Sequence, residues 1–190
     1  DPPAAARPES IMIDPVPFYS DTVPLAFFVW GPALVMLLFW LGGVWASRQG
    51  VARLLESDWN GFNAADIEKL FSAYGQERRE RYRSRVLPAD MAFAFTYAIV
   101  GAVIVAGIAM RGYPWWVAAL CGGGWLFGGL CDAVENLAIA RLIDKYPTIV
   151  PGDVALASGF TQLKLVLFTL GIVGALAAAY LAFRPLAIPA

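Results

Sequence analysis

Apolar residues along this chain gather into four long stretches separated by polar segments. The stretches cover about residues 25–46, 89–110, 113–143 and 153–183. A helix of about 20 apolar residues crosses a hydrocarbon core of about 30 Å, so each stretch is long enough to span a bilayer. The pattern therefore predicts an all-α integral membrane protein, in which residues 25–190 form a four-transmembrane-helix bundle.

The polar segment between the first two stretches, residues 47–88, carries a shorter helical pattern. Asn63 is suited to cap the N-terminus of a helix, and Asp66 falls in its first turn. The apolar positions that follow at helical spacing are Ile67, Leu70, Phe71 and Tyr74. Gly75 can end this helix. We expect an amphipathic surface helix that lies on the membrane, in a groove of this protein or on a partner.

Basic residues are unevenly distributed between the two sides of the expected bundle. Ten lie in residues 47–88 or between the third and fourth stretches: Arg48, Arg53, Lys69, Arg78, Arg79, Arg81, Arg83, Arg85, Arg141 and Lys145. Three fall on the opposite side: Arg7, Arg111 and Arg184. Because cytoplasmic loops are enriched in Lys and Arg, both termini are predicted on the periplasmic side of a bacterial inner membrane, cytoplasmic or intracytoplasmic. The alternating charges of residues 76–85 are typical of a solvated helix beside lipid headgroups, with a docking site for an acidic partner as the alternative.

The segment before the first stretch, residues 1–24, differs from the rest of the chain. It is acidic and contains six prolines, at positions 2, 3, 8, 15, 17 and 24. Such a segment alone in water is polyproline-like or disordered. We interpret it as an outer, periplasmic tail that becomes ordered against a partner surface or against the chain's own helices.

Composition narrows the chemistry. The chain has no histidine, which excludes imidazole-ligated haem or chlorophyll, His-based zinc sites and Ser-His or Cys-His hydrolases. Cys121 and Cys131 are ten residues apart on one expected helix, about 15 Å, too far for a disulfide. No metal site and no cofactor are predicted. Bound membrane lipids are expected, and a pigment or quinone would be held by packing. The net charge of −1 and the absence of a recognition motif predict no nucleic-acid partner.

Ionisable residues interrupt three of the four apolar stretches. They are Asp90, Asp132, Glu135 and Lys164, and the polar residues Asn136 and Thr161 accompany them. Counted from the outer end of each helix, Asp90, Glu135 and Lys164 all lie about 29–32 Å deep. They therefore reach one level near the cytoplasmic edge of the bilayer, where they can meet. Ionisable groups inside a membrane are costly and indicate a functional site until shown otherwise.

Small residues continue the charged face of each helix. Asp132, Glu135 and Asn136 share a face with Gly124 and Gly128. Two other stretches repeat the pattern, with Asp90, Ala94, Tyr97 and Gly101 in one and Thr161, Lys164, Phe168 and Gly171 in the other. Small residues let helices approach closely, so Gly101, Gly124, Gly128 and Gly171 are expected at helix contacts.

Two interpretations of the charged cluster remain open. In the first, it is an ion-pair network that fixes helix register, with Lys164 on Glu135 or Asp132, and Asp90 on Arg85 or Asn136. In the second, it is a polar pocket that opens inward and binds a lipid headgroup, a small amphiphile or a proton. Three carboxylates against one lysine leave a surplus of negative charge, which favours a functional role.

Three segments, residues 65–93, 131–143 and 157–168, resemble small uncharacterised bacterial proteins with four transmembrane helices. The resemblance lies in a D-x-x-E-N motif at Asp132, Glu135 and Asn136, a T-x-x-K motif at Thr161 and Lys164, and Tyr82 preceding Asp90. It implies a four-helix fold and a site that pairs the two motifs, and it implies no activity. The long proline-rich tail departs from this group.

The sequence favours a non-enzymatic accessory or structural subunit that packs into a larger membrane complex, such as a photosynthetic or respiratory one. The alternative is a lipid- or amphiphile-binding membrane protein. In its enzymatic version, Asp132 or Glu135 would act as acid or base, and Lys164 would hold a phosphate or polarise a carbonyl. A proton-coupled transporter is the third hypothesis.

Overall fold

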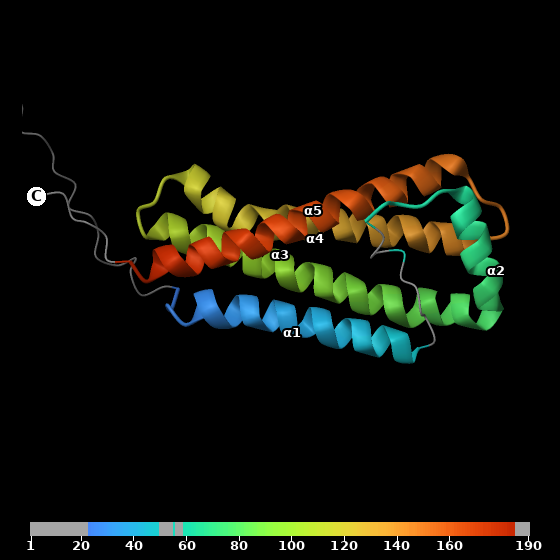
Figure 1. Ribbon diagram of the computed structural model, residues 1–190, viewed down its shortest axis with the longest axis horizontal. Helices are drawn as coiled ribbons and strands as arrows, with labels where there is room; N and C mark the ends of the chain where they lie inside the picture. The colour runs from blue at the N-terminus through green and yellow to red at the C-terminus, as the bar shows by residue number, and fades with distance from the viewer. Residues whose placement is uncertain (1–22, 50–54, 56–58, 185–190) are drawn as a thin grey trace, which may run out of the picture.

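The computed structural model describes residues 23–49, 55 and 59–184, and the rest of the chain is drawn as a grey trace in Figure 1. The described residues form five α-helices and one π-helical turn. These are α1 (Phe27–Arg48), α2 (Ala64–Arg81), η3 (Tyr82–Val86), α3 (Leu87–Met110), α4 (Trp115–Lys145) and α5 (Pro151–Ala182). The expected tail lies almost wholly outside the described residues, as do Arg7 and Arg53.

Four of these helices, α1, α3, α4 and α5, are long and apolar enough to cross a membrane. The prediction of an all-helical chain with four helices able to span a membrane is thereby confirmed for the described residues, and each observed helix end lies within two residues of its expected position. The start of α5 lies two residues before the predicted stretch, which began at residue 153. The helix begins at Pro151, with Val150 as its N-cap. Proline suits the first helical position because its missing N–H would have had no partner there.

The long helices run side by side, and α2 crosses them at one end (Figure 1). We call this the α2 end. The other we call the Arg111 end, where α3 stops and Arg111 Nη2 donates to the carbonyl of Val23, just before α1. Tyr113 at the same end donates to the carbonyl of Leu181 in the last turn of α5. These contacts bring the starts of α1 and α4 together with the ends of α3 and α5.

The surface helix α2 begins where the sequence predicts. Asn63 Oδ1 accepts hydrogen bonds from the backbone N–H groups of Ala65 and Asp66, at 2.9 and 3.2 Å. Asp66 Oδ2 accepts the N–H of Asn63 at 3.0 Å, which completes a capping box. Gly75 interrupts the helix with φ of 64°. A positive φ favours glycine because it has no Cβ to clash.

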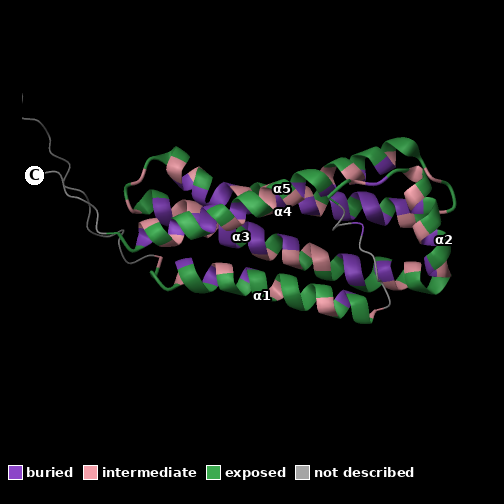
Figure 2. Ribbon diagram, viewed as in Figure 1, coloured by how far each residue is buried: buried purple, intermediate pink, exposed green. Residues whose placement is uncertain are grey.

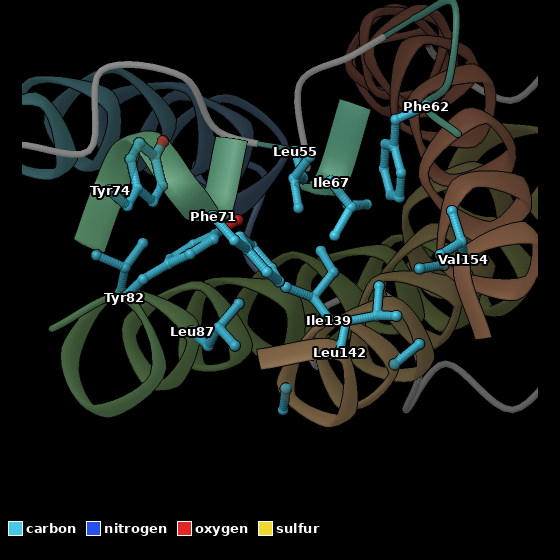
Figure 3. Close-up of a cluster of buried hydrophobic side chains, with 14 of the residues drawn as sticks. Leu55, Phe62, Ile67, Phe71, Tyr74, Tyr82, Leu87, Ile139, Leu142 and Val154 are labelled. Carbon is cyan, nitrogen blue, oxygen red and sulfur yellow. The ribbon is translucent and has the colours of Figure 1, made fainter. Parts of the chain in front are cut away.

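The apolar face of α2 packs on this protein itself. Ile67, Phe71 and Tyr74 are buried against Ile139 and other residues of α4 and α5 at the α2 end (Figure 3). Tyr82 of η3 and Leu87 of α3 join the same cluster. The sequence left three locations open for the apolar face of this helix: the membrane, a groove of this protein or a partner. In the structure, the face lies in a groove on the chain's own helices.

A second core lies within the long helices, and α1 contributes least to it. Phe28 and Val35 of α1 pack against residues of α3, α4 and α5 in this core. Apart from Gly31 and Ala46, the remaining residues of α1 are exposed or half-buried, whereas buried residues recur along α3 and α4 (Figure 2). Helix α1 is thus a peripheral element beside a tightly packed group formed by α3, α4 and α5.

Candidate functional site

The seven polar residues singled out in the sequence come together toward the α2 end of the long helices. We call them the charged cluster: Asp90 and Tyr97 from α3, Asp132, Glu135 and Asn136 from α4, and Thr161 and Lys164 from α5. Each helix presents its members at intervals of three, four or seven residues, which places them on one face. The packing of three helices then converts three separate faces into one polar interior.

Lys164 lies at the centre of the cluster. Its Nζ is 2.8 Å from Asp132 Oδ1, 2.7 Å from Glu135 Oε2 and 4.0 Å from Asp90 Oδ2. Its side chain is only 7% exposed. The expected pairing of Lys164 is therefore present with both carboxylates of α4, and the third carboxylate lies at the limit of ion-pair distance.

The neutral members of the cluster bind the carboxylates. Tyr97 donates to Asp132 Oδ2 at 3.0 Å, and Asn136 Nδ2 donates to Asp90 Oδ2 at 2.9 Å and to Asp132 Oδ1 at 3.1 Å. Thr161 donates to Glu135 Oε1 at 2.5 Å. Asp90 takes Asn136 as its partner, one of the two expected. Within the described residues, Asn136 Oδ1 is buried without a hydrogen-bond donor.

Burial divides the cluster into a closed and an open part. Asp132, Glu135, Asn136 and Thr161 are at most 2% exposed, because α4 and α5 cover them. Asp90 is different, since 27% of its side chain is exposed. The cluster is therefore accessible from the side of α3, through Asp90.

The glycines predicted at helix contacts all lie where two helices meet closely. A Cβ on Gly101 would lie 2.6 Å from the carbonyl oxygen of Gly122, and one on Gly124 would lie 2.5 Å from the backbone nitrogen of Gly171. A Cβ on Gly128 would be 3.3 Å from Leu167. These positions hold α4 against α3 on one side and against α5 on the other, and so fix the helices that carry the charged cluster.

Sequence reasoning missed a tryptophan between the packing glycines. Trp125 is fully buried, and its Nε1 donates to the carbonyl of Phe168 at 3.1 Å. The space for its ring exists because Gly171 on α5 has no side chain, and a Cβ there would overlap the indole. A signal was available, since Trp125 directly follows Gly124 in the glycine-rich part of α4.

A cavity of about 870 Å³ adjoins the open part of the cluster. Its walls come from the second half of α1, from residues 86–97 of η3 and α3, and from α5. Asp90, Tyr97, Asp132 and Lys164 are among the residues that line it. The other lining residues are largely apolar, and several of them, such as Trp40 and Leu41, are also exposed on the surface. The cavity thus joins the charged cluster to the apolar exterior of the helices.

Aromatic rings line much of this cavity. Phe39 of α1 lies with its ring centroid 5.4 Å from that of Phe168 on α5 and 6.2 Å from that of Phe93 on α3. The ring centroid of Tyr97 lies 5.2 Å from that of Phe168. Trp40, Trp45 and Trp59 complete the aromatic lining. This arrangement depends on the position of α1, so no motif within α3, α4 or α5 could have predicted it.

The chemistry of the site is that of a polar recess. Within residues 23–49, 55 and 59–184, no group of three His, Cys, Asp or Glu side chains is placed to hold a metal ion. The carboxylates instead surround an ammonium group, and the recess opens onto a space of the size that ligands occupy in proteins.

Comparisons with known proteins place the chain in no family. No protein-family model, no curated protein and no solved structure matches it.

Proposed function

We propose that this membrane protein binds an amphiphile in the cavity between α1, α3 and α5, without acting on it as an enzyme. The observation that carries the proposal is that a cavity of about 870 Å³ is lined mainly by apolar and aromatic side chains and also by charged ones. An amphiphile needs both, because its tail gains by leaving water and its headgroup must keep polar partners. The sequence alone favours a complex subunit, and the cavity raises the amphiphile-binding hypothesis above it.

Filling the cavity tests this function. Gly43 on α1 lines the cavity, and no atom lies within 4 Å of where its Cβ would be. A Gly43→Leu variant therefore keeps the fold and occupies ligand space. Native mass spectrometry of the gently extracted protein should show a bound amphiphile on the wild type that Gly43→Leu loses.

Gly159→Leu is the matched control for this experiment. Gly159 lies on α5, also has no atom within 4 Å of its Cβ position, and is not part of the cavity wall. The control variant should retain the amphiphile. A wild type that carries no amphiphile, or equal retention by all three proteins, would refute the proposal.

We further propose the orientation of the chain: an inner-membrane protein with the α2 end in the cytoplasm and both termini in the periplasm. The support is the excess of Lys and Arg in α2, in η3 and in the ends of the neighbouring helices. In a background without Cys121 and Cys131, an impermeant thiol reagent should label Arg184→Cys in intact cells. It should label Lys69→Cys only after the membrane is opened, and the reverse result would invert the orientation.

A second candidate function is that of a subunit in a larger membrane assembly. It is supported by a stripe on α1 with heptad-like spacing, Trp30, Leu34, Leu37 and Leu41, whose exposed fractions are 71%, 47%, 50% and 44%. Such spacing is typical of a seam between two helices. If another membrane protein covers the stripe, Leu37→Arg should abolish its co-purification in mild detergent. Unchanged co-purification, or none with the wild type, would reject this second role.

A further inference from the structure

The charges around the cavity do not balance. Three carboxylates, those of Asp90, Asp132 and Glu135, surround the single ammonium of Lys164. The ionisable residues that line the cavity are Asp90, Asp132 and Lys164, and no arginine is among its described lining residues. A fully ionised cluster would carry a net charge of −2 in a poorly solvated place. Such a surplus is stable only if protons or a bound cation neutralise it.

Lys164 is not placed to attract an anionic headgroup. Its Nζ lies within 2.8 Å of two carboxylates, and its side chain is almost wholly buried. A phosphate that approached it would meet the same carboxylates at short range and would have to displace one of them. Repulsion between like charges at such distances is large in a medium of low dielectric constant. The cavity therefore disfavours anions, even though it contains a lysine.

Asp90 is the carboxylate that a ligand can reach. It has the largest exposed fraction in the charged cluster, and it lies farther from Lys164 than the other two carboxylates do. Its contacts with Asn136 and Lys164 both use Oδ2. Asn136 Oδ1 has no donor among the described residues, but it belongs to the closed part of the cluster and is not among the residues that line the cavity. The acceptor that the open part offers a ligand is therefore the carboxylate of Asp90.

The wall next to Asp90 favours the same kind of group. Phe93 lies one turn along α3 from Asp90, with its ring centroid 5.1 Å from that of Tyr97, and Phe39 and Phe168 lie beside it. The faces of aromatic rings carry partial negative charge and attract ammonium groups, most strongly where water is excluded. The Asp90 carboxylate and the neighbouring rings therefore both favour a cation, and in particular one with apolar substituents.

We propose that the amphiphile bound in this cavity carries an ammonium headgroup, a primary or a quaternary amine, which contacts Asp90 and the neighbouring aromatic rings while its tail lies against α1. This inference rests on the proposed amphiphile-binding function and names its ligand class. The ammonium supplies the positive charge that the charged cluster lacks. It belongs either to a zwitterionic membrane lipid or to a free long-chain amine.

The test compares headgroups on identical tails. The full-length protein in a neutral detergent is offered phosphatidylethanolamine, phosphatidylcholine, phosphatidylglycerol and phosphatidic acid with the same acyl chains, and separately a long-chain primary amine. Binding is read by native mass spectrometry. We expect the ammonium-bearing ligands to be retained about tenfold more than the anionic ones, a difference of about 1.4 kcal/mol. Retention of the two ammonium phospholipids identifies a membrane lipid, and retention of the free amine alone identifies that source.

Variants tie the preference to its residues. Asp90→Asn removes the accessible charge and should lower retention of the ammonium ligands about tenfold. Phe39→Leu should also lower their retention, without changing any charge. Asp144→Asn is the matched control, because this carboxylate is exposed at the α2 end in an ion pair with Arg83. If Asp90→Asn fails to fold, Phe39→Leu decides alone.

Each result has one meaning for the two proposals. Equal retention of all headgroups, or unchanged selectivity in the Asp90 and Phe39 variants, overturns the ammonium inference and leaves amphiphile binding intact, provided that Gly43→Leu still blocks retention. A wild type that retains none of the ligands overturns both, and protons then neutralise the surplus carboxylates.

Discussion

The packing of α4 differs sharply from that of α1, although both helices are long and apolar. Helix α4 touches α3 and α5 backbone to backbone at Gly124 and other glycines, and it carries three members of the charged cluster. Helix α1 is held by Phe28 and Val35 in one core and by Ala46 in the cluster at the α2 end, and its second half borders a cavity. Glycines such as Gly124 allow α4 to contact a neighbouring backbone. On α1, by contrast, no atom lies within 4 Å of a Cβ on Gly42 or Gly43.

Apolar character alone does not decide how tightly a membrane helix packs. Lipid tails are as apolar as leucine, so helices associate through close van der Waals contact and polar bonds rather than through the hydrophobic effect. Helix α4 has both kinds of contact with its neighbours. In its second half, helix α1 contacts its neighbours through Phe39 and Ala46 but makes no close backbone contact at Gly42 or Gly43, and that half borders a space where a ligand fits.

The largest effect should come from the charged cluster. Lys164→Met removes the only cation among three carboxylates, and we expect it to lower the free energy of unfolding by about 3–5 kcal/mol. Reversible unfolding in a denaturing detergent measures the change. The double variant Lys164→Met with Glu135→Gln should recover part of the loss. Lys145→Met is the control, since its pair with Asp153 is half-exposed and contributes about 0–1 kcal/mol. Equal losses in both single variants would contradict the central role of Lys164.

The next largest effect should separate the two kinds of glycine. Gly124→Ala places a Cβ 2.5 Å from the backbone of Gly171, which cannot move without separating the helices. We expect a loss of about 1–3 kcal/mol in the same unfolding assay. Gly42→Ala on α1 meets no atom, and it should leave stability unchanged or raise it by up to about 1 kcal/mol, because alanine favours helices. If the two variants behave alike, the contrast between α4 and α1 does not hold.

A smaller loss is expected from Trp125→Phe. The change keeps an aromatic ring against Gly171 but removes the hydrogen bond to the carbonyl of Phe168. The expected cost is about 1 kcal/mol, seen as a lower melting temperature in detergent. Trp116→Phe serves as the control, because that ring is 54% exposed and should contribute nothing measurable.

The smallest effect on overall stability should come from the attachment of α1. Arg111 donates to the carbonyls of Val23 and Gly107 and lies over the ring of Phe28. Arg111→Gln should raise hydrogen exchange in residues 27–35 about tenfold while leaving α4 unchanged, since α1 can open without the other helices. Exchange that rises equally in α1 and α4 would show that the four helices open as one unit.

The sequence predicted the long helices well because each signal was local. Runs of apolar residues set their ends, and the capping box at Asn63 set the start of α2. The predicted stretch at residues 153–183 left out Pro151, the first residue of α5, although proline suits a first helical turn. The charged cluster was also predictable, because the depth of each charge follows from counting residues along a helix.

The remaining parts depend on how helices sit relative to one another. The close contacts of Gly122, Gly129 and Gly174 are set by the rotation of each helix, which composition does not reveal. The cavity depends on where α1 lies beside α3 and α5, which is a result of many weak contacts rather than of one motif. For the same reason, the aromatic wall around Phe39 could not be inferred from α1 alone.

The distribution of the charged cluster over three helices has a consequence for biosynthesis. Asp132 and Glu135 are synthesised before Lys164, because α5 follows α4 along the chain. Inserting α4 alone would place two carboxylates near the membrane edge without their cation, whereas α1 contains no charged residue before Arg48 and can insert alone. We therefore expect α4 and α5 to enter the bilayer as a pair. Helix α1 is synthesised first, but the cavity can form only after α3 and α5 have been synthesised and have packed beside it.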